Sequence, residues 1–470
     1  MQAKKILIKS LSAVIICVTL LLSCFGVSAA STQKVAVLKS NKKVTPNGGN
    51  YINVGSGTIA EIVGYEAETF NAKSTNDYSR PTNNYLPKGT VDYCSQDYIY
   101  SKNTDQKMKY VLLRYGKQVY SSWKDSVSGK TIKVVKKYIG TLPDHNEMEI
   151  GFLKNGSTHS VLKLTPMWKA PFILKIKPQE YVDSKAHNYR IEEFTATYID
   201  ITLCYTTVIK GKLTIPKDNP LFKSAKIIKN KSNDGKTLDY KIRLYLKKKG
   251  GFYGWDSYYD KNGNLIFKFL NPCKVKKADN KYGADLTGAR ILIDVGHGGK
   301  DCGALGKKGT KYSEAKRNLI LAKKLKKELT SIGATVYMTR TSNVTAPTVE
   351  KIKQLKKLKP DYCIAIHHDW CSSSKVNGFG AYYTNPFSHK ASEVMVKYAK
   401  QSKVYKNTSL KSHYYAVARS SYCPVVLTEN GFMSNPTEYK KILSDSYNNK
   451  KAKYLTKAIV HYFLFINRKS

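Results

Sequence analysis

The stretch ARILIDVGHGG, residues 289–299, decides the fold class of the second half of the chain. It reads as a buried strand that runs into a glycine turn, with His297 at the tip. A nearly continuous apolar strand of this kind is typical of a parallel sheet that is covered on both faces. His297 alone is either a metal ligand or a polar residue that ends a strand. The choice depends on which other side chains reach the same point.

Strands and amphipathic helices alternate after about residue 286. SEAKRNLILAKKLKKELTSIG (313–333) is predicted to be a helix, because its apolar residues recur at steps of three and four. Further strands are expected at 334–340, 360–368 and 423–431, and further helices at 347–358, 390–402 and 450–466. This alternation predicts an α/β domain over 286–470, with a twisted, mostly parallel sheet and helices on both faces.

The preceding region, 31–271, has a β-rich texture. Stretches such as KYVLLRYGKQVY (109–120) and LDYKIRLYLKK (238–248) are rich in Val, Ile, Tyr and Leu, and clusters of Asn, Asp and Gly separate such stretches. We expect a sandwich or barrel-like architecture here, in one unit or two. The polar, lysine-rich segment 272–285 is predicted to be a linker.

The first 29 residues have the pattern of a secretory signal peptide. Lysines precede an apolar run, and VSA stands before the expected cleavage after Ala29. The alternative is a membrane anchor, which the short run and its interruption at Ser23 disfavour. LLSC also resembles the box before a lipidated cysteine, which would anchor the protein through Cys24. We therefore expect an exported protein that has no membrane span after cleavage.

The composition narrows the function classes. The 470-residue chain is 41% hydrophobic, so it can build cores and is not a disordered polymer. Its net charge of +45 comes mostly from lysine. Such a surface would be attracted to the anionic polymers of a bacterial wall, or would simply keep the protein soluble. No nucleic-acid recognition motif accompanies the charge, so nucleic acid is not expected as a partner.

The nine cysteines are scattered along the chain. Seven remain after cleavage at Ala29, and no C-x-x-C pair occurs among them. This spacing argues against a zinc site built from thiolates. An odd number also leaves at least one thiol free or paired between chains.

Four metal-competent side chains follow the predicted strands or open the first helix. His297 and His367 end two strands, Glu429 ends a third, and Glu314 begins the helix at 313–333. Ligands bind beyond the carboxyl ends of strands in such a fold, so all four belong to one edge of one sheet. Two histidines and a glutamate are an established ligand set for catalytic zinc, and a second carboxylate can move the proton of the attacking water. Each residue alone has an ordinary structural alternative, and the hypothesis rests on the combination.

The same segment resembles a known family. ILIDVGHGGKDCGALG, SEAKRNLILAKKL, CIAIHHD, GFGAYYTNP and YYAVARSSYCPVVLTENGFMSNPTEYKKIL occur in the order found in the zinc-dependent N-acetylmuramoyl-L-alanine amidases of bacterial cell walls, the amidase 3 family. The resemblance implies that His297, Glu314 and His367 bind zinc and that Glu429 is the catalytic acid and base. It also implies cleavage of the amide between N-acetylmuramic acid and L-alanine of peptidoglycan.

The chain departs from the family pattern at three places, none of which removes a ligand. Val295 stands where proline is commoner, His368 stands where a small residue is usual, and the last motif reads TENGF rather than VELGF. His368 makes the choice of ligand ambiguous, because strand alternation lets only one of two neighbouring side chains point at a metal. The alignment favours His367. The arginines of MTR and AVAR, Arg340 and Arg419, are interpreted as structural or orienting.

Other functions stay open at this point. The same ligands would serve a zinc peptidase that cuts within the stem peptide. A non-catalytic wall-binding protein, or a structural protein held on the wall by charge, is also compatible with export and a basic surface. The β-rich region is interpreted as a wall-targeting module, an interpretation that depends only on its position next to an amidase-like domain.

Overall fold

A computed structural model describes most of the second half of the chain and parts of the first. The described residues are 43–44, 50–53, 59–62, 66–71, 81–101, 109–113, 118–122, 135–138, 142–143, 145–178, 182–183, 189–231, 238–413 and 415–467. The predicted signal peptide and the alternative lipidation site at Cys24 lie outside them. Across the described part, none of the helices has the length and apolarity needed to cross a membrane.

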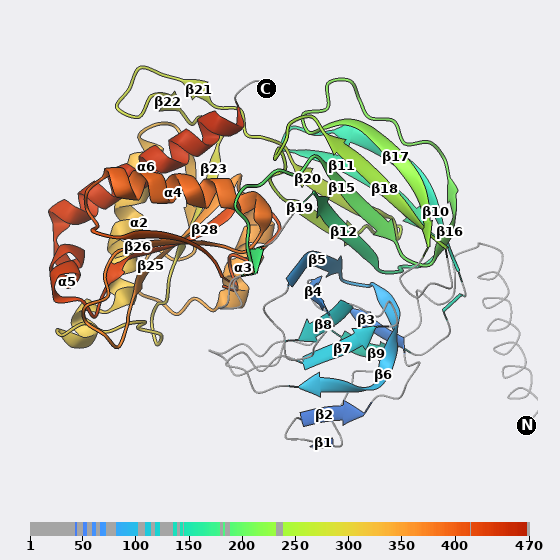
Figure 1. Ribbon diagram of the computed structural model, residues 1–470, viewed down its shortest axis with the longest axis horizontal. Coiled ribbons are helices and arrows are strands. Elements are labelled where there is room, and N and C mark those ends of the chain that lie inside the picture. Colours follow the sequence, from blue (N-terminus) through green and yellow to red (C-terminus); the bar gives the residue numbers. More distant parts are fainter. Residues whose placement is uncertain are drawn as a thin grey trace, which may run out of the picture.

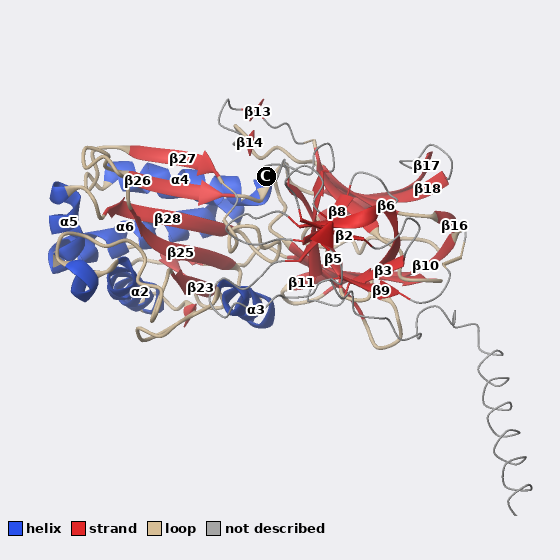
Figure 2. Ribbon diagram, turned by 90° about the horizontal axis from the view of Figure 1, so that it is seen from below, coloured by secondary structure: helices blue, strands red, loops and turns tan. Residues whose placement is uncertain are grey.

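A six-stranded sheet forms the centre of the C-terminal domain (Figures 1 and 2). Its order is β24-β23-β25-β28-β26-β27. The strand bounds are β23 (Arg290–Val295), β24 (Thr335–Met338), β25 (Tyr362–Asp369), β26 (Phe379–Tyr383), β27 (Thr408–Ser412) and β28 (Val425–Phe432). The first four in that order run parallel, so their carboxyl ends meet at one edge.

Helices cover both faces of this sheet. They are α2 (Glu314–Thr330), α3 (Thr348–Leu358), α4 (His389–Gln401), α5 (Pro436–Leu443) and α6 (Asp445–Ile466), with short 3-10 turns at Gly309–Tyr312 and Pro386–Ser388. Figure 2 shows α2, α4 and α6 behind the sheet. Tyr362 of β25 packs on this side against Tyr462 of α6. On the other face, Lys351 of α3 reaches Asp294 of β23, with 2.9 Å between Nζ and Oδ1.

The predicted fold class is confirmed, with one addition to the sheet. The alternating pattern places β23, β24, β25 and β28 and the helices between them close to where they lie. The pattern alone did not predict β26 and β27, which extend the sheet beyond β28. β26 runs antiparallel to β28, and β27 runs parallel to β26. "Mostly parallel" therefore describes the sheet, with a reversed pair at one side.

Two antiparallel-rich sheets pack face to face before the α/β domain. One has the order β16-β10-β11-β20-β19 and the other β12-β15-β18-β17. The bounds are β10 (Asn146–Asn155), β11 (His159–Pro166), β12 (Phe172–Lys177), β15 (Tyr198–Leu203), β16 (Thr206–Lys210), β17 (Phe222–Lys231), β18 (Leu238–Leu246), β19 (Trp255–Tyr259) and β20 (Leu265–Leu270). Phe172 and Phe267 meet between the sheets, with ring centroids 4.7 Å apart. The two sheets form a β-sandwich.

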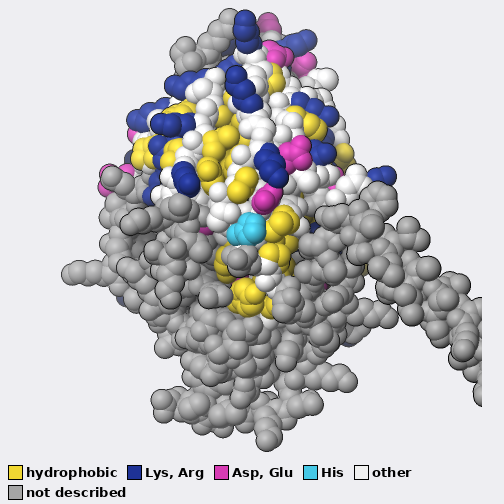
Figure 3. All heavy atoms as spheres, turned by 90° about the vertical axis from the view of Figure 1, so that its right-hand side faces the viewer, with side chains coloured by type: hydrophobic (Ala, Val, Ile, Leu, Met, Phe, Trp, Pro, Cys, Tyr) yellow, Lys and Arg dark blue, Asp and Glu magenta, His cyan; other side chains and the backbone are white. Residues whose placement is uncertain are grey.

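A further sheet precedes the sandwich and lies below it in Figure 1. Its strands are β1 (Lys43–Val44), β2 (Asn50–Asn53), β3 (Ile59–Ile62), β4 (Glu66–Asn71), β5 (Pro81–Pro87), β6 (Val91–Ser101), β7 (Lys109–Leu113), β8 (Gln118–Ser122) and β9 (Val135–Tyr138). A two-stranded pair, β13 (Val182–Asp183) and β14 (Tyr189–Arg190), follows β12. On the face shown in Figure 3, Lys and Arg side chains are spread over the described part, with apolar side chains between them.

The sandwich and the α/β domain share one apolar core. A single cluster of buried residues runs from Ile62 through the sandwich to Ile466. Phe252 packs edge-on against Phe387, and Trp255 N donates to Ser421 O at 2.7 Å. The segment 272–285, predicted as a linker, contains the short hairpin β21 (Lys276–Lys277) and β22 (Ala284–Asp285). The six cysteines from Cys204 to Cys423 are free thiols.

Candidate metal centre and acid-base residue

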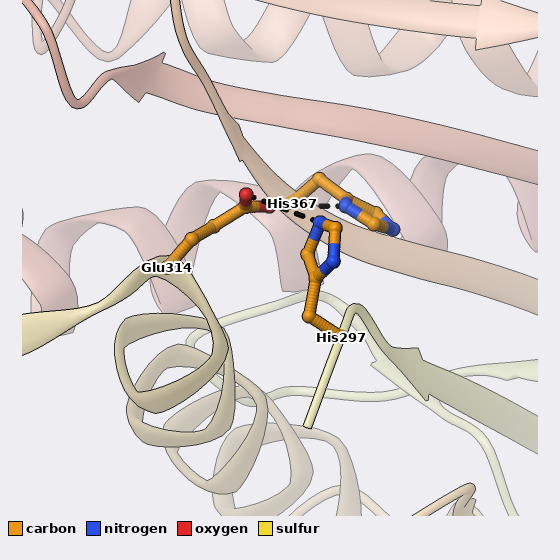
Figure 4. Close-up of side chains that lie close together, drawn as sticks. All are labelled: His297, Glu314 and His367. Carbon is orange, nitrogen blue, oxygen red and sulfur yellow. Dashed lines mark hydrogen bonds and ion pairs between the residues drawn. The ribbon is translucent and has the colours of Figure 1, made fainter. Parts of the chain in front are cut away.

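His297 lies on the turn that follows β23 (Figure 4). Its φ is +58°, and Gly298 and Gly299 follow with φ of +141° and +61°. Glycine adopts positive φ without steric cost, which explains why GHGG reverses the chain so sharply here. The turn is closed by Gly298 N, which donates to Asp301 O at 2.7 Å. It aims the His297 ring back toward the start of α2.

Glu314 is the first residue of α2 and is 4% exposed. Its Oε2 lies 3.1 Å from His297 Nε2, and its Oε1 lies 3.0 Å from His367 Nδ1. Ala304 N donates to Oε2 at 2.9 Å. Burial opposes the charge, but the hydrogen bonds from both imidazoles keep the pKa of Glu314 well below its usual range. The carboxylate is therefore ionised and lies between the two rings.

His367 occupies β25 directly beside the turn of His297. The two imidazole rings are 4.9 Å apart and nearly perpendicular. Gly296 makes this approach feasible, because a Cβ on that residue would lie 2.4 Å from His367 Cε1. The neighbouring His368 has its Nδ1 2.7 Å from Asn318 Oδ1 in α2, so the two histidines of CIAIHHD have different partners.

These three side chains fit a tetrahedral cation. One ligand atom from each of His297, Glu314 and His367 lies within 4.8 Å of the others. Zinc bonds of about 2.0–2.1 Å in a tetrahedron place ligand atoms about 3.3 Å apart. The two imidazole–carboxylate distances, 3.1 and 3.0 Å, are close to that edge length. Two imidazole nitrogens and one carboxylate oxygen are also an established donor set for catalytic zinc, so the residues fit the ion.

Two residues that sequence reasoning did not assign support the ligands. Asp301 Oδ2 lies 2.9 Å from His297 Nδ1, and Asn318 Nδ2 donates to Glu314 Oε1 at 3.1 Å. Burial lowers the pKa of His297, but hydrogen bonds to Asp301 and Glu314 outweigh it and raise the pKa to about 9. The sequence spacing of Asp301 and Asn318 could have identified them, because each stands four positions after the candidate ligand that it contacts.

Arg340 ties the turn to the start of α2. Its guanidinium donates to His297 O at 2.7 Å, to Gly296 O at 2.9 Å and to Ala315 O at 2.6 Å. The side chain thus joins the segments that carry His297 and Glu314. These contacts agree with the interpretation of Arg340 as structural or orienting, which stays a prediction.

Glu429 lies on β28, beside the cluster and outside it. Its Cα is the register partner of His367 on β25, so the two side chains emerge on the same face of the sheet. Glu429 is 8% exposed, and its Oε2 has no hydrogen-bond partner among the described residues. Burial, and then the charges of Glu314 and Asp369, raise the pKa of Glu429 well above its usual range. A carboxyl group in this state can hold a proton near neutral pH.

Comparison with known proteins matches this part of the chain. Residues 291–461 match the Amidase_3 family, described as N-acetylmuramoyl-L-alanine amidase. The probable cell wall amidase LytH of Staphylococcus aureus is 34% identical over 164 residues, which are 34% of this chain and 54% of LytH. The chain thus spans about half the length of the curated relatives it matches.

Solved structures resemble the same portion of the chain. The catalytic domain of CwlV, an N-acetylmuramoyl-L-alanine amidase from Bacillus (Paenibacillus) polymyxa var. colistinus, is 28% identical and covers 38% of this chain and 99% of its own, with a TM-score of 0.36. The amidase AmiC2 of Nostoc punctiforme is 25% identical and covers 37% and 97%, also with a TM-score of 0.36. The family match and the sequence motifs thus agree that the segment 291–461 of this chain is similar to the N-acetylmuramoyl-L-alanine amidases of the Amidase_3 family.

Proposed function

We propose that this protein hydrolyses the amide between N-acetylmuramic acid and L-alanine in peptidoglycan, with zinc as its metal. The observation that carries the proposal is the His297–Glu314–His367 cluster, with the buried Glu429 in register beside it, in an Amidase_3 segment. A cluster that only stabilised the fold would not need a second carboxyl group on the same face, buried and with one oxygen that has no hydrogen-bond partner among the described residues.

Zinc would be held by His297, Glu314 and His367. When bound, it supplies a Lewis acid that makes water a competent nucleophile near neutral pH and polarises the amide carbonyl. The chain's own contribution is to keep the three ligands fixed. In the metal-free protein, hydrogen bonds from both imidazoles keep Glu314 anionic, and Ala304 N donates to its Oε2 at 2.9 Å. Asp301 fixes the orientation of the His297 ring.

Glu429 would carry the proton. As a carboxylate it takes the proton of the water that attacks the carbonyl carbon, and as an acid it gives that proton to the nitrogen of the departing alanine. Its burial supports both steps, because a raised pKa makes the carboxyl group a better base once ionised and a proton donor near neutral pH. Glu429 Oε2 has no hydrogen-bond partner among the described residues, so no contact within the described structure competes for it.

The proposed location of the protein is the bacterial cell wall. Peptidoglycan is the proposed partner, and the N-terminal sequence supports export. The net charge of +45 supports a further attraction to anionic wall polymers, which would weaken as ionic strength rises. In this proposal the β-rich region helps to place the α/β domain on the wall.

The test is the product of the reaction. Purified peptidoglycan would be incubated with the protein, with and without a zinc chelator, and the fragments identified by mass spectrometry. We expect intact stem peptides with a free alanine amine, formed only when zinc is present. Shortened stems would instead establish the alternative peptidase, which uses the same ligands. Zinc-loaded protein that releases no fragment would contradict an enzymatic role and favour wall binding.

A further inference from the structure

We propose that His368 is a positioning residue, which fixes the carboxylate of Glu314 by holding the side-chain amide of Asn318 in one orientation. The inference rests on the metal-binding role proposed for Glu314. It concerns the second histidine of CIAIHHD, which the assignment of the candidate ligands leaves without a role.

The hydrogen bonds of Asn318 show why its orientation matters. Its Nδ2 donates to Glu314 Oε1 at 3.1 Å and to Gly296 O at 3.2 Å, and its Oδ1 lies 2.7 Å from His368 Nδ1. Both amide hydrogens therefore point at acceptors. If the amide were rotated by 180°, its oxygen would face a carboxylate and a carbonyl, with no hydrogen between them. The observed orientation is the one that supports Glu314.

His368 completes the hydrogen bonds of Asn318 in that orientation. Asn318 Oδ1 accepts only, so the close contact requires the proton of His368 to be on Nδ1. A ring with its proton on Nδ1 can pair with the amide oxygen and cannot accept from the amide nitrogen. The Nδ1 donor thus satisfies the Asn318 oxygen that faces away from Glu314, and this contact adds to those that hold the amide in the observed orientation. The contact is deeply buried, since Asn318 is 0% and His368 1% exposed, so water does not compete for it.

The cost of keeping histidine here argues against a packing role alone. His368 Nε2 is buried and has no hydrogen-bond partner among the described residues. An unpartnered buried polar atom destabilises the fold, because it loses its hydrogen bonds to water and gains none in the protein. An apolar side chain of similar size would avoid this cost. The Nδ1 contact to Asn318 is what such a side chain could not provide.

A main-chain contact of His368 lets the role of its ring be tested apart from that of its backbone. The main-chain N of His368 donates to Glu314 Oε1 at 3.1 Å. That bond does not use the side chain, so the leucine, asparagine and glutamine variants keep its donor. A variant at residue 368 therefore tests the ring and Asn318, while the strand and its main-chain bond to Glu314 remain.

The experiment measures zinc affinity of the full chain by competition with a chromogenic chelator, and the melting temperature of the metal-free protein. Leucine at this position removes the donor, and asparagine places an amide N–H close to where Nδ1 stands. We expect His368→Leu to weaken zinc binding about 10–100-fold, as loss of an outer hydrogen-bond partner does at metal sites. The metal-free melting temperature should stay equal or rise. His368→Asn should retain most of the affinity.

The role of Asn318 is tested in the same assay. His368→Leu should add little to the loss caused by Asn318→Leu, because both act through one contact. Should His368→Leu fail to fold, His368→Gln replaces it, since glutamine carries its amide nearer the Nε2 position and should lose affinity where asparagine does not.

Three results would overturn the proposal. The first is a folded His368→Leu protein, or its His368→Gln replacement, that binds zinc as tightly as the wild type. The second is full additivity with Asn318→Leu. The third is a wild-type protein that binds no zinc, which would overturn the metal role of Glu314 itself and is thereby distinguished from the other two.

Discussion

At the scale of single residues, Glu429 separates proton transfer from metal binding. The Glu429→Gln variant keeps the shape of the side chain and removes its acid-base chemistry. Because Glu429 is outside the ligand cluster, we expect zinc content to stay at the wild-type level. Turnover of peptidoglycan should fall about 10²–10⁴-fold, the usual contribution of a general acid-base group. Metal analysis checks the zinc content, and the release of stem peptides checks the turnover. A substantially active variant would contradict the assigned role.

Asp301 acts at the same scale through the ring of His297. Its carboxylate accepts from Nδ1 at 2.9 Å and so presents Nε2 to the cluster. Asp301→Ala should weaken zinc binding about 10–100-fold with little change in melting temperature, since the side chain is half-exposed. Asp301→Asn keeps an oxygen acceptor without the charge and should fall between the two. Equal zinc affinity in all three proteins would remove Asp301 from the site.

At the scale of elements, the turn after β23 must pass close to β25. Gly296 meets this requirement, because a Cβ there would lie 2.4 Å from the His367 ring. Gly296→Ala should displace that ring and lower zinc affinity by about tenfold or more. Gly151→Ala in β10 is the control, since its Cβ would meet mainly the flexible Lys163 side chain, at 3.1 Å. A loss of affinity in both variants would contradict a local effect.

Helix α6 introduces a pH dependence through a buried lysine. Lys451 donates to Asn430 O at 2.9 Å, and burial, only partly offset by Glu438, lowers the pKa of Lys451 to about 7. The folded protein therefore binds fewer protons than the unfolded chain between pH 7 and about 10.4, the ordinary lysine pKa. Stability from this group rises with pH across that window, by at most about 1.4 kcal/mol per pH unit, and is lost toward pH 7.

The Lys451→Met variant tests this sign. Its free energy of unfolding, measured by urea titration from pH 6 to 9, should lack the upward slope that the wild type shows above pH 7. Lys450→Met is the matched control, because Lys450 is the preceding residue in the chain and its side chain is exposed. A wild-type slope that persists in Lys451→Met would assign the pH dependence to another group.

At the scale of the whole molecule, the sandwich and the α/β domain stabilise each other. Phe252 packs on Phe387, Tyr383 OH is 3.0 Å from Ile191 N, and Trp255 N bonds to Ser421 O just before β28. The fragment 286–470 loses all these contacts. We expect it to melt several degrees below the fragment 142–470, which retains the sandwich. Differential scanning calorimetry of the two fragments checks this, and equal melting temperatures would show that the α/β domain is self-sufficient.

The sequence by itself determined the α/β class and the edge on which the site lies. Both follow from local patterns: apolar runs and helical periodicity identify β23, β25, β28 and α2, and parallel strands bring their carboxyl ends together. The ligand types could also be predicted, because the histidines stand at or just beyond the ends of strands and Glu314 stands at the start of α2. The reversed strand β26 was not, since its direction depends on pairing with a distant strand.

Only the tertiary structure decided which contacts orient the candidate ligands. Strand alternation says that His367 and His368 face opposite ways, but not which one meets Glu314. That depends on the register of β25 against β23 and on how α2 is placed. The apolar core that the α/β domain shares with the sandwich could not be predicted from the sequence either. Periodicity is a property of neighbouring residues, whereas packing between segments more than a hundred residues apart is set by shape and burial across the whole chain.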